Sequence, residues 1–197
     1  MTTAELLDEL AQIFPRETCI VCSLGRTSEE VFHRFPHNTL FLDSMGDVAS
    51  VACGLALAIS PRPVVAIDTD GSHLFGLANL PTIAALSSRL TNLALLVLDN
   101  VLYESGGSLP SRLCKLDWKH LGKAFDLSIV VAEDREQLES SLEDVFRKLI
   151  YTVVNINNPE LPANATKSID GVESRYRFIR HIEHLTGRTI LYPAVKS

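Results

Sequence analysis

An acidic side chain and an amide side chain follow two apolar stretches of this chain, at Asp70 and Asn100. The stretch PVVAI leads to Asp70, and the stretch LALLVL runs directly into Asp99 and Asn100. If both stretches are parallel strands, their carboxyl ends bring these groups to one edge of a sheet. Mg²⁺ prefers oxygen ligands and is usually held by one or two protein groups together with phosphate oxygens. The pattern therefore predicts a site for Mg²⁺ carrying a diphosphate.

Two further loops are expected at the same edge of the sheet. The four loops are Gly25-Arg26-Thr27-Ser28, Asp43-Ser44-Met45-Gly46, Asp70-Gly71-Ser72 and Asp99-Asn100-Val101-Leu102. Each carries a glycine, a small polar residue or an oxygen that can bind a metal. Glycine lets backbone approach a phosphate closely, and the first turn of a following helix offers N–H donors. We expect Asp70 and Gly71 to form an exposed turn, so that Asp70→Ala would leave the fold intact.

Apolar strands alternate with helices along most of the chain, which predicts an α/β fold. A mostly parallel sheet of about six strands with helices on both faces fits this order. The expected strands are residues 19–23, 39–42, 63–67, 93–98, 127–131 and 151–156. The expected helices are residues 2–13, 27–35, 48–59, 80–86, 117–125, 135–150 and 172–185.

The order of elements favours one domain over residues 1–157, followed by a linker, a last helix and a tail over residues 158–197. The last helix is basic and aromatic, and we expect a solvated helix or one that packs on a partner. The apolar residues of the tail are not periodic, so the tail is a candidate to dock on a neighbouring chain.

The composition argues against several classes of protein. A formal net charge of −6 and the lack of a basic run disfavour a nucleic-acid or anionic-membrane surface. The apolar runs are too short to span a bilayer, and the N-terminus does not resemble a signal peptide, so we expect a cytoplasmic protein. Cys19 and Cys22 would lie on opposite faces of a strand, which favours core packing over zinc or redox use.

The signature Asp70-Gly71, then 27 residues, then Asp99-Asn100 resembles the thiamine-diphosphate signature, usually GDG followed by NN. DSMGDVASVACGLALA is similar to the GSMGHAS segment of phosphonopyruvate and sulfopyruvate decarboxylases. DNVLYESGGSLPS is similar to their Gly-Gly loop, CSLGRTSEEVF to their diphosphate loop, and DWKHLGKAF to their next helix. The resemblance covers roughly residues 18 to 155. It implies the diphosphate-binding domain of a thiamine-diphosphate enzyme, with thiamine diphosphate and Mg²⁺ as cofactors.

The resemblance also implies a role for individual residues. The Asp70 carboxylate, the Asn100 side-chain oxygen and the Leu102 carbonyl would be the Mg²⁺ ligands. The residues implied to hold the diphosphate are Gly25, Thr27, Gly71 and Ser72. Met45 would support the bent cofactor, the Asp43 carbonyl would accept a hydrogen bond from its aminopyrimidine, and Ser44 belongs to the same cofactor loop.

Three positions depart from the family pattern. Thr69 replaces the first glycine of GDG, which constrains the backbone but leaves the metal ligand. Asp43 replaces a glycine, which is tolerable if its φ is negative. Asp47 replaces the family histidine, and a carboxylate there would alter proton handling or the charge preferred in the substrate.

Several residues have alternative interpretations. Asp70 alone could cap a helix, and Asn100 alone could satisfy loop backbone. Asp47, His73 and Glu104 are candidates near the reacting centre, although His73 could be structural, and Tyr103 is a candidate for substrate contact. Surface positions are expected for His120, His181, His184, Arg112 and Lys115.

The family uses a glutamate on a separate pyrimidine-binding domain to activate the cofactor, and 197 residues hold only the diphosphate-binding half. The resemblance therefore implies one subunit of a split enzyme that needs a pyrimidine-binding partner chain and decarboxylates a short 2-oxo acid. Two alternatives remain open: a subunit of an acetolactate-synthase-like carboligase, and a non-catalytic assembly subunit of the same fold. A dinucleotide-binding domain is disfavoured because no G-x-G-x-x-G follows the first strand.

Overall fold

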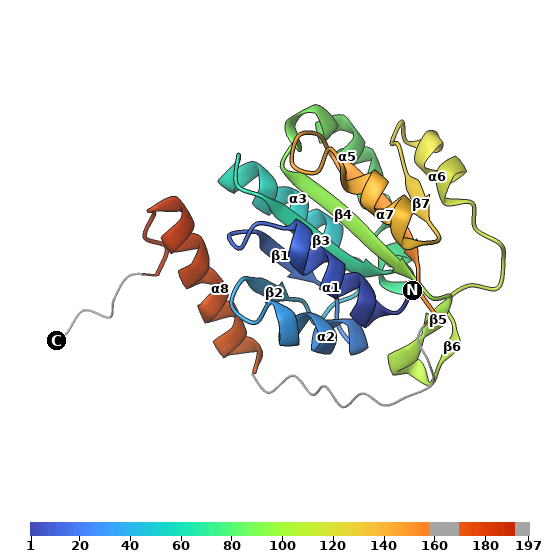
Figure 1. The fold of residues 1–197 in the computed structure, drawn as a ribbon, viewed down its shortest axis with the longest axis horizontal. Helices are drawn as coiled ribbons and strands as arrows, with labels where there is room; N and C mark the ends of the chain where they lie inside the picture. Colours follow the sequence, from blue (N-terminus) through green and yellow to red (C-terminus); the bar gives the residue numbers. More distant parts are fainter. Residues whose placement is uncertain (158–169, 192–197) are drawn as a thin grey trace.

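The computed structural model describes residues 1–157 and 170–191. Within them a central sheet has the strand order β2-β1-β3-β4-β8-β7, and all its neighbouring strands are parallel (Figure 1). The strands are β1 (Cys19–Cys22), β2 (Thr39–Phe41), β3 (Val64–Thr69), β4 (Leu93–Asp99), β7 (Val130–Ala132) and β8 (Ile150–Asn155). The predicted α/β fold with a parallel sheet of about six strands is confirmed.

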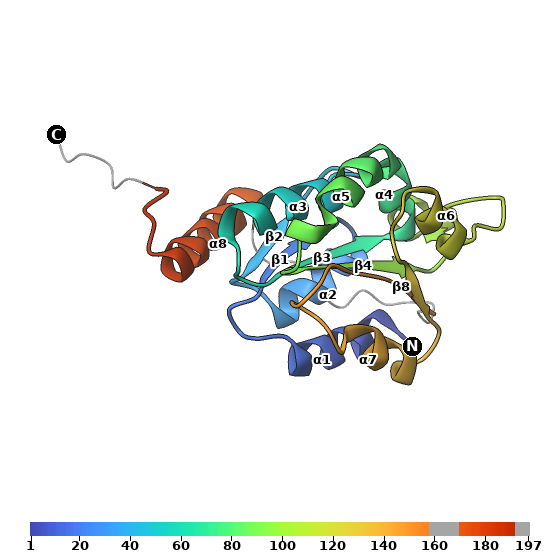
Figure 2. The same ribbon diagram turned by 90° about the horizontal axis from the view of Figure 1, so that it is seen from above.

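Helices cover both faces of the sheet (Figure 2). One face carries α1 (Thr3–Ile13), α2 (Arg26–Arg34) and α7 (Arg135–Leu142), and the other carries α3 (Val48–Ile59), α4 (Asp70–Phe75), α5 (Leu80–Leu86) and α8 (Gly171–Thr186). Two short 3₁₀ turns, η1 (Leu77–Asn79) and η2 (Ser87–Arg89), flank α5. After β4 the chain forms a hairpin of β5 (Leu102–Tyr103) and β6 (Leu109–Pro110), with η3 (Glu104–Gly106) between the two strands. Helix α6 (Trp118–Ala124) follows this hairpin.

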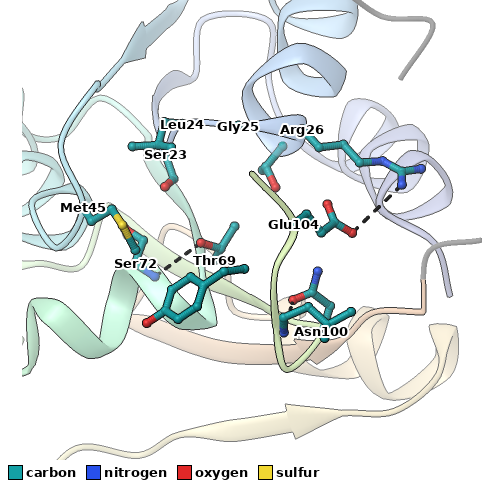
Figure 3. Close-up of a pocket in the computed structure, with 12 residues that line it drawn as sticks. Ser23, Leu24, Gly25, Arg26, Met45, Thr69, Ser72, Asn100 and Glu104 are labelled. Carbon is teal, nitrogen blue, oxygen red and sulfur yellow. Dashed lines mark hydrogen bonds and ion pairs between the residues drawn. The ribbon is translucent and has the colours of Figure 1, made fainter. Parts of the chain in front are cut away.

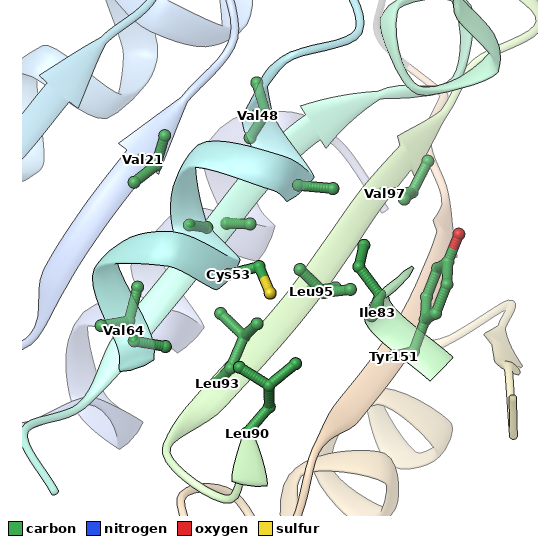
Figure 4. Packing of buried hydrophobic residues seen from close by; sticks show 14 of the residues in the cluster. Val21, Val48, Cys53, Val64, Ile83, Leu90, Leu93, Leu95, Val97 and Tyr151 are labelled. Carbon is green, nitrogen blue, oxygen red and sulfur yellow. The ribbon is translucent and has the colours of Figure 1, made fainter. Parts of the chain in front are cut away.

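Continuous apolar strands are needed because the sheet is buried on both faces. All seven residues of β4 are buried, and its six apolar residues alternate between two hydrophobic clusters. Leu93, Leu95 and Val97 pack under α3 and α5 (Figure 4), and the residues between them face α1 and α7. Cys19 belongs to one cluster and Cys22 to the other, so their placement on opposite faces of the strand is confirmed.

The order of the strands creates a crevice at one edge of the sheet. From β1 the chain crosses to β2 on one side, and β3 then pairs with β1 on the other side. Adjacent loops diverge where the direction of winding reverses, and ligands of open α/β sheets bind at this point. The loops after β1 and β3 lie at this switch point.

Two local predictions were wrong. The helix expected over residues 135–150 ends at Leu142, because Val145 and Phe146 turn back to pack against the core. Phe146 has φ of 63° and its ring centroid lies 5.7 Å from that of Phe14. The second error is the exposed turn at Asp70 and Gly71, since α4 begins directly at Asp70.

Helix α8 packs beside β2 through Phe178 and Ile182, which are buried in the same cluster as α3. The predicted linker and tail lie mostly outside the described residues, and the boundary at residue 157 stays a prediction. No helix in the described ranges is long and apolar enough to cross a membrane.

We expect the native chain to expose one fast-reacting thiol. Cys114 is exposed, whereas Cys19, Cys22 and Cys53 are buried. Burial raises the pKa of Cys19 to about 12, and the thiolate is the reactive form, so this thiol stays protonated at pH 8. Titration with a chromogenic disulfide reagent at pH 8 should show one fast thiol that Cys114→Ser removes and Cys53→Ser keeps. Any fast-reacting thiol in the Cys114→Ser chain would contradict the burial of the other three cysteines.

Candidate functional site

A cleft lies at the switch point, and four loops that follow β1, β2, β3 and β4 line it (Figure 3). The residues that line it are Ser23, Leu24, Gly25, Arg26, Thr27, Met45, Thr69, Ser72, Asn100, Leu102, Tyr103 and Glu104. The four loops that the sequence grouped together therefore do meet in space.

Six of the ten predicted cofactor-binding residues line this cleft: Gly25, Thr27, Met45, Ser72, Asn100 and Leu102. Asp43, Ser44, Asp70 and Gly71 lie within two residues of a lining residue in the sequence but do not line the cleft themselves. Tyr103 and Glu104, the candidates for substrate contact, do line it. The cofactor roles of all ten stay predictions.

The loop after β1 turns into α2 at Gly25, which has φ of 80° and therefore favours glycine. The Ser28 hydroxyl donates to the Gly25 carbonyl at 2.7 Å, which fixes the first turn of α2. Thr27 is buried at the rim of the cleft. The first backbone N–H groups of α2 have no acceptor within the helix, so this end of α2 favours negative charge.

The loop after β2 is tied to the loop after β3. The backbone N–H of Gly46 donates to the Ser72 hydroxyl at 3.1 Å, and Gly46 has φ of 88°. Asp47 accepts a hydrogen bond from the Ser44 hydroxyl at 2.6 Å and is exposed. Asp43 does not have a positive φ, so the condition for replacing the family glycine is met.

Thr69 explains how the first glycine of the signature can be replaced. Its φ is −103° and its side chain accepts from the backbone N–H of Ser72 at 3.4 Å, so Thr69 is the N-cap of α4. Asp70 is the first helical residue, and the interpretation of Asp70 as a helix cap is wrong.

Asp70 is fully buried, which corrects the expectation of an exposed loop carboxylate. Its Oδ2 accepts hydrogen bonds from the Ser111 hydroxyl and, at 2.7 Å, from Arg112 Nη1. Its Oδ1 is buried and has no hydrogen-bond partner within the described part of the chain. Burial raises the pKa of Asp70, and nearby Asp99 adds to this, while Ser111 and Arg112 oppose it.

Asn100 sits at the start of the loop that leaves β4. Its Oδ1 accepts a hydrogen bond from the backbone N–H of Leu102 at 3.0 Å. The alternative in which Asn100 satisfies loop backbone therefore holds for one of the two lone pairs of Oδ1. Val101 has φ of 62°, and this turn directs the chain back over the cleft. Across the cleft, Arg26 Nη1 lies 4.0 Å from Glu104 Oε1, a partly exposed pair that contributes little to stability.

His73 lies in the core behind α4, where a structural role is supported. Its Nε2 is hydrogen-bonded to the Tyr151 hydroxyl, and its Nδ1 is 3.4 Å from Asp68 Oδ2. Burial raises the pKa of Tyr151, and the carboxylate of Asp68 adds to this effect. His73 is 2% exposed and does not line the cleft.

Two of the expected surface residues are placed differently by the structure. Arg112 is only 13% exposed and bridges Asp70 and Asp99, so its assignment as a solvated loop charge was wrong. His181 is half-buried, and burial lowers its pKa. The surface assignments of Lys115, His120 and His184 are confirmed.

The group around Asp70, which consists of Asp99, Ser111, Arg112 and Trp118, was not predicted from the sequence. Trp118 Nε1 donates to Asp99 Oδ2 at 2.7 Å. No local pattern distinguishes Arg112 from Lys115, because both follow the same loop and only its closure decides which one returns to the sheet. The Asp-Asn pair was the available signal, since its first member ends a strand and needs a buried partner.

No family model matches the chain. It is 30% identical to the sulfopyruvate decarboxylase subunit beta of Methanothermobacter thermautotrophicus over 169 residues, which span 85% of this chain and 88% of that protein. The chain belongs to this family. The protein of the same name from Methanococcus maripaludis is 28% identical over 189 residues, spanning 93% of this chain and 98% of that one.

This chain is also similar to part of a longer protein. The phosphonopyruvate decarboxylase of Streptomyces viridochromogenes is 35% identical to this chain over 133 residues, 66% of this chain and 30% of that protein. A solved structure described as a putative thiamin diphosphate-dependent enzyme from Mycobacterium smegmatis superposes with a TM-score of 0.66 at 23% identity. It covers 82% of this chain and 32% of that one, and this likeness supports the fold.

Gly71 and Tyr103 should be energetically coupled, because a Cβ at position 71 would overlap the Tyr103 ring. We expect Gly71→Ala to destabilise the chain by about 1 kcal/mol or more, and Tyr103→Ala to remove most of that cost. Urea unfolding of both single variants and the double variant should give a coupling of about 0.5–3 kcal/mol.

Gly54→Ala is the matched control for this cycle. A Cβ at Gly54 meets nothing within 4 Å, and Gly54 lies within α3, so this variant should be no less stable than the native chain. Additive effects of Gly71→Ala and Tyr103→Ala would show that the hairpin does not pack on α4.

Proposed function

We propose that this chain is the diphosphate-binding subunit of a thiamine-diphosphate-dependent enzyme. In this proposal it decarboxylates a short 2-oxo acid that carries a sulfonate or phosphonate, together with a pyrimidine-binding partner chain. The observation that carries the proposal is the buried Asp70 carboxylate, one oxygen of which has no partner among the described residues, next to a cleft that residues of four loops line. Membership of the sulfopyruvate decarboxylase beta family supports it.

The residues present fit a magnesium ion. A buried carboxylate oxygen without a hydrogen bond is costly unless a cation or proton satisfies it. Among the described residues Asp70 Oδ1 is such an atom, and Asn100 Oδ1 has a second lone pair beyond its bond to Leu102. With the Leu102 carbonyl these are hard oxygen donors, the type that Mg²⁺ prefers.

The cleft also fits a diphosphate. Gly25 and Thr27 stand at the N-terminal end of α2, where backbone N–H groups favour an anion. Ser72 contributes a hydroxyl from the opposite wall. Gly25, Thr27, Gly71 and Ser72 would therefore hold the diphosphate, and Met45, Asp43 and Ser44 would contact the rest of the cofactor.

When bound, thiamine diphosphate supplies the carbanion and the electron sink that decarboxylation of a 2-oxo acid needs. The contribution of this chain is to bind and orient the diphosphate end and to exclude water from it. The departures from the family pattern do not oppose this role, since Thr69 caps α4 and Asp43 has a tolerable backbone conformation. Asp47 and Glu104 remain candidates for contact with the substrate.

A partner chain is supported by the exposed apolar side chains near the cleft. Met45 is 37% exposed, Phe75 68%, Leu102 39% and Leu109 63%. Large apolar side chains gathered at one edge are typical of an interaction surface. We propose that the pyrimidine-binding partner covers this edge, supplies the activating glutamate, and completes the enzyme in the cytoplasm.

Asp70→Asn should weaken Mg²⁺-dependent binding of thiamine diphosphate by more than about 100-fold, because changes to the mere partners of metal ligands already cost about 10- to 100-fold. Calorimetry with the assembled subunits, with and without Mg²⁺, measures this effect. The charge-matched control is Asp126→Asn, at an exposed residue between α6 and β7, which should bind like the native chain. Unchanged cofactor affinity in a folded Asp70→Asn assembly would contradict the assignment of Asp70.

The reaction itself can be tested by supplying sulfopyruvate or phosphonopyruvate to the assembled subunits. We expect CO₂ and the free aldehyde, and the isolated chain should not turn over at an enzymatic rate. A carboligated product would favour the acetolactate-synthase-like alternative. Binding of the cofactor without turnover of either kind would favour a non-catalytic assembly subunit.

A further inference from the structure

The loop that follows β4 returns to the strand it leaves. After Asp99 the chain forms the β5–β6 hairpin, in which Leu102 pairs with Pro110. The backbone N–H of Ser111 then donates to the Val101 carbonyl at 2.9 Å and closes the neck of the loop. This closure places Ser111 and Arg112 directly on the side chain of Asp70.

Arg112 makes a bidentate contact with Asp99. Its Nη1 donates to Asp99 Oδ1 at 2.9 Å and its Nη2 to Asp99 Oδ2 at 2.8 Å. Trp118 Nε1 donates to the same carboxylate, and the Arg112 guanidinium carbon lies 5.9 Å from the centre of the Trp118 ring. Paired hydrogen bonds of this kind fix the guanidinium in one plane and one position.

The positive charge of Arg112 is shared unequally between the carboxylates of Asp99 and Asp70. Asp99 accepts both hydrogen bonds of the bidentate contact, so Arg112 and Asp99 form a neutral ion pair. Asp70 receives a single bond from Arg112, at 2.7 Å, and one from Ser111, both on Oδ2. A net negative charge therefore remains on Asp70, and its Oδ1 is the buried oxygen without a partner in the described ranges.

We propose that Ser111 and Arg112 are positioning residues that hold Asp70 Oδ2 and so direct Oδ1 to a divalent cation. The inference rests on the proposed function, since the cation is the one that would carry the diphosphate. It also ties cation binding to the loop that supplies Asn100, Leu102, Tyr103 and Glu104 to the cleft. Arg112 thus supports the metal ligand and does not take the place of the metal.

If Arg112 instead replaced the cation, its removal would have the opposite effect on cation binding. If the guanidinium occupied the position of the cation, its removal would leave Asp70 and Asp99 both uncompensated and would tighten cation binding. If Arg112 positions Asp70, its removal frees the carboxylate to rotate and weakens cation binding.

The test measures binding of Mn²⁺, as a probe for Mg²⁺, to the chain assembled with its partner subunit in the presence of thiamine diphosphate. The electron paramagnetic resonance signal of free Mn²⁺ reports binding without any need for turnover. We expect Arg112→Met to weaken binding about 10- to 100-fold and Ser111→Ala to weaken it about 10-fold. Arg112→Lys should recover part of the loss, because it keeps the charge and one donor nitrogen but not the bidentate geometry.

Lys115→Met is the matched control, because it removes an exposed cation from the same loop and should bind Mn²⁺ like the native chain. If Arg112→Met fails to fold, Ser111→Ala decides, since it removes one hydroxyl and leaves the ion pairs. Native affinity, or tighter binding, in the folded variants would overturn the positioning role. Absence of Mn²⁺ binding by the native assembly would instead overturn the proposed function, and the inference with it.

Discussion

The buried carboxylate of Asp70 is the constraint on which the rest of the site depends. A charge at the end of a central strand is costly unless every oxygen is satisfied. Ser111 and Arg112 satisfy Oδ2, whereas Oδ1 has no partner within the described ranges and is the atom that we propose binds the cation. To bring those two residues to Asp70, the loop after β4 must fold back across the cleft, and this carries Asn100, Leu102 and Tyr103 into its wall.

The parallel sheet makes this arrangement possible. Because the carboxyl ends of β1, β3 and β4 share one edge, three loops from distant parts of the sequence converge there without long connections. Helices on both faces bury the strands, so a ligand can meet the sheet at the ends of its strands. A binding site at the switch point is therefore a consequence of the topology, and the loop residues decide what it binds.

The fold was predictable from the sequence because continuous apolar runs mark strands that are buried on both faces. The Asp70 and Asn100 loops could be grouped for the same reason, since each follows such a run. The predictions that failed depended on contacts between residues that are distant in the sequence. Helical periodicity continued past Leu142, but packing of Phe146 on Phe14 ended the helix. The charge of Arg112 was visible, but its burial followed from how the hairpin closes, which no local pattern encodes.

We propose that Asp70 and Asn100 hold one divalent cation together. A crystal structure of the assembled subunits, grown with Mn²⁺ and thiamine diphosphate and phased at the manganese absorption edge, tests it directly. We predict one anomalous peak within coordination distance of Asp70 Oδ1 and Asn100 Oδ1, with Arg112 still paired to Asp99. A peak that lies elsewhere, with Oδ1 of Asp70 turned away from it, would contradict this account.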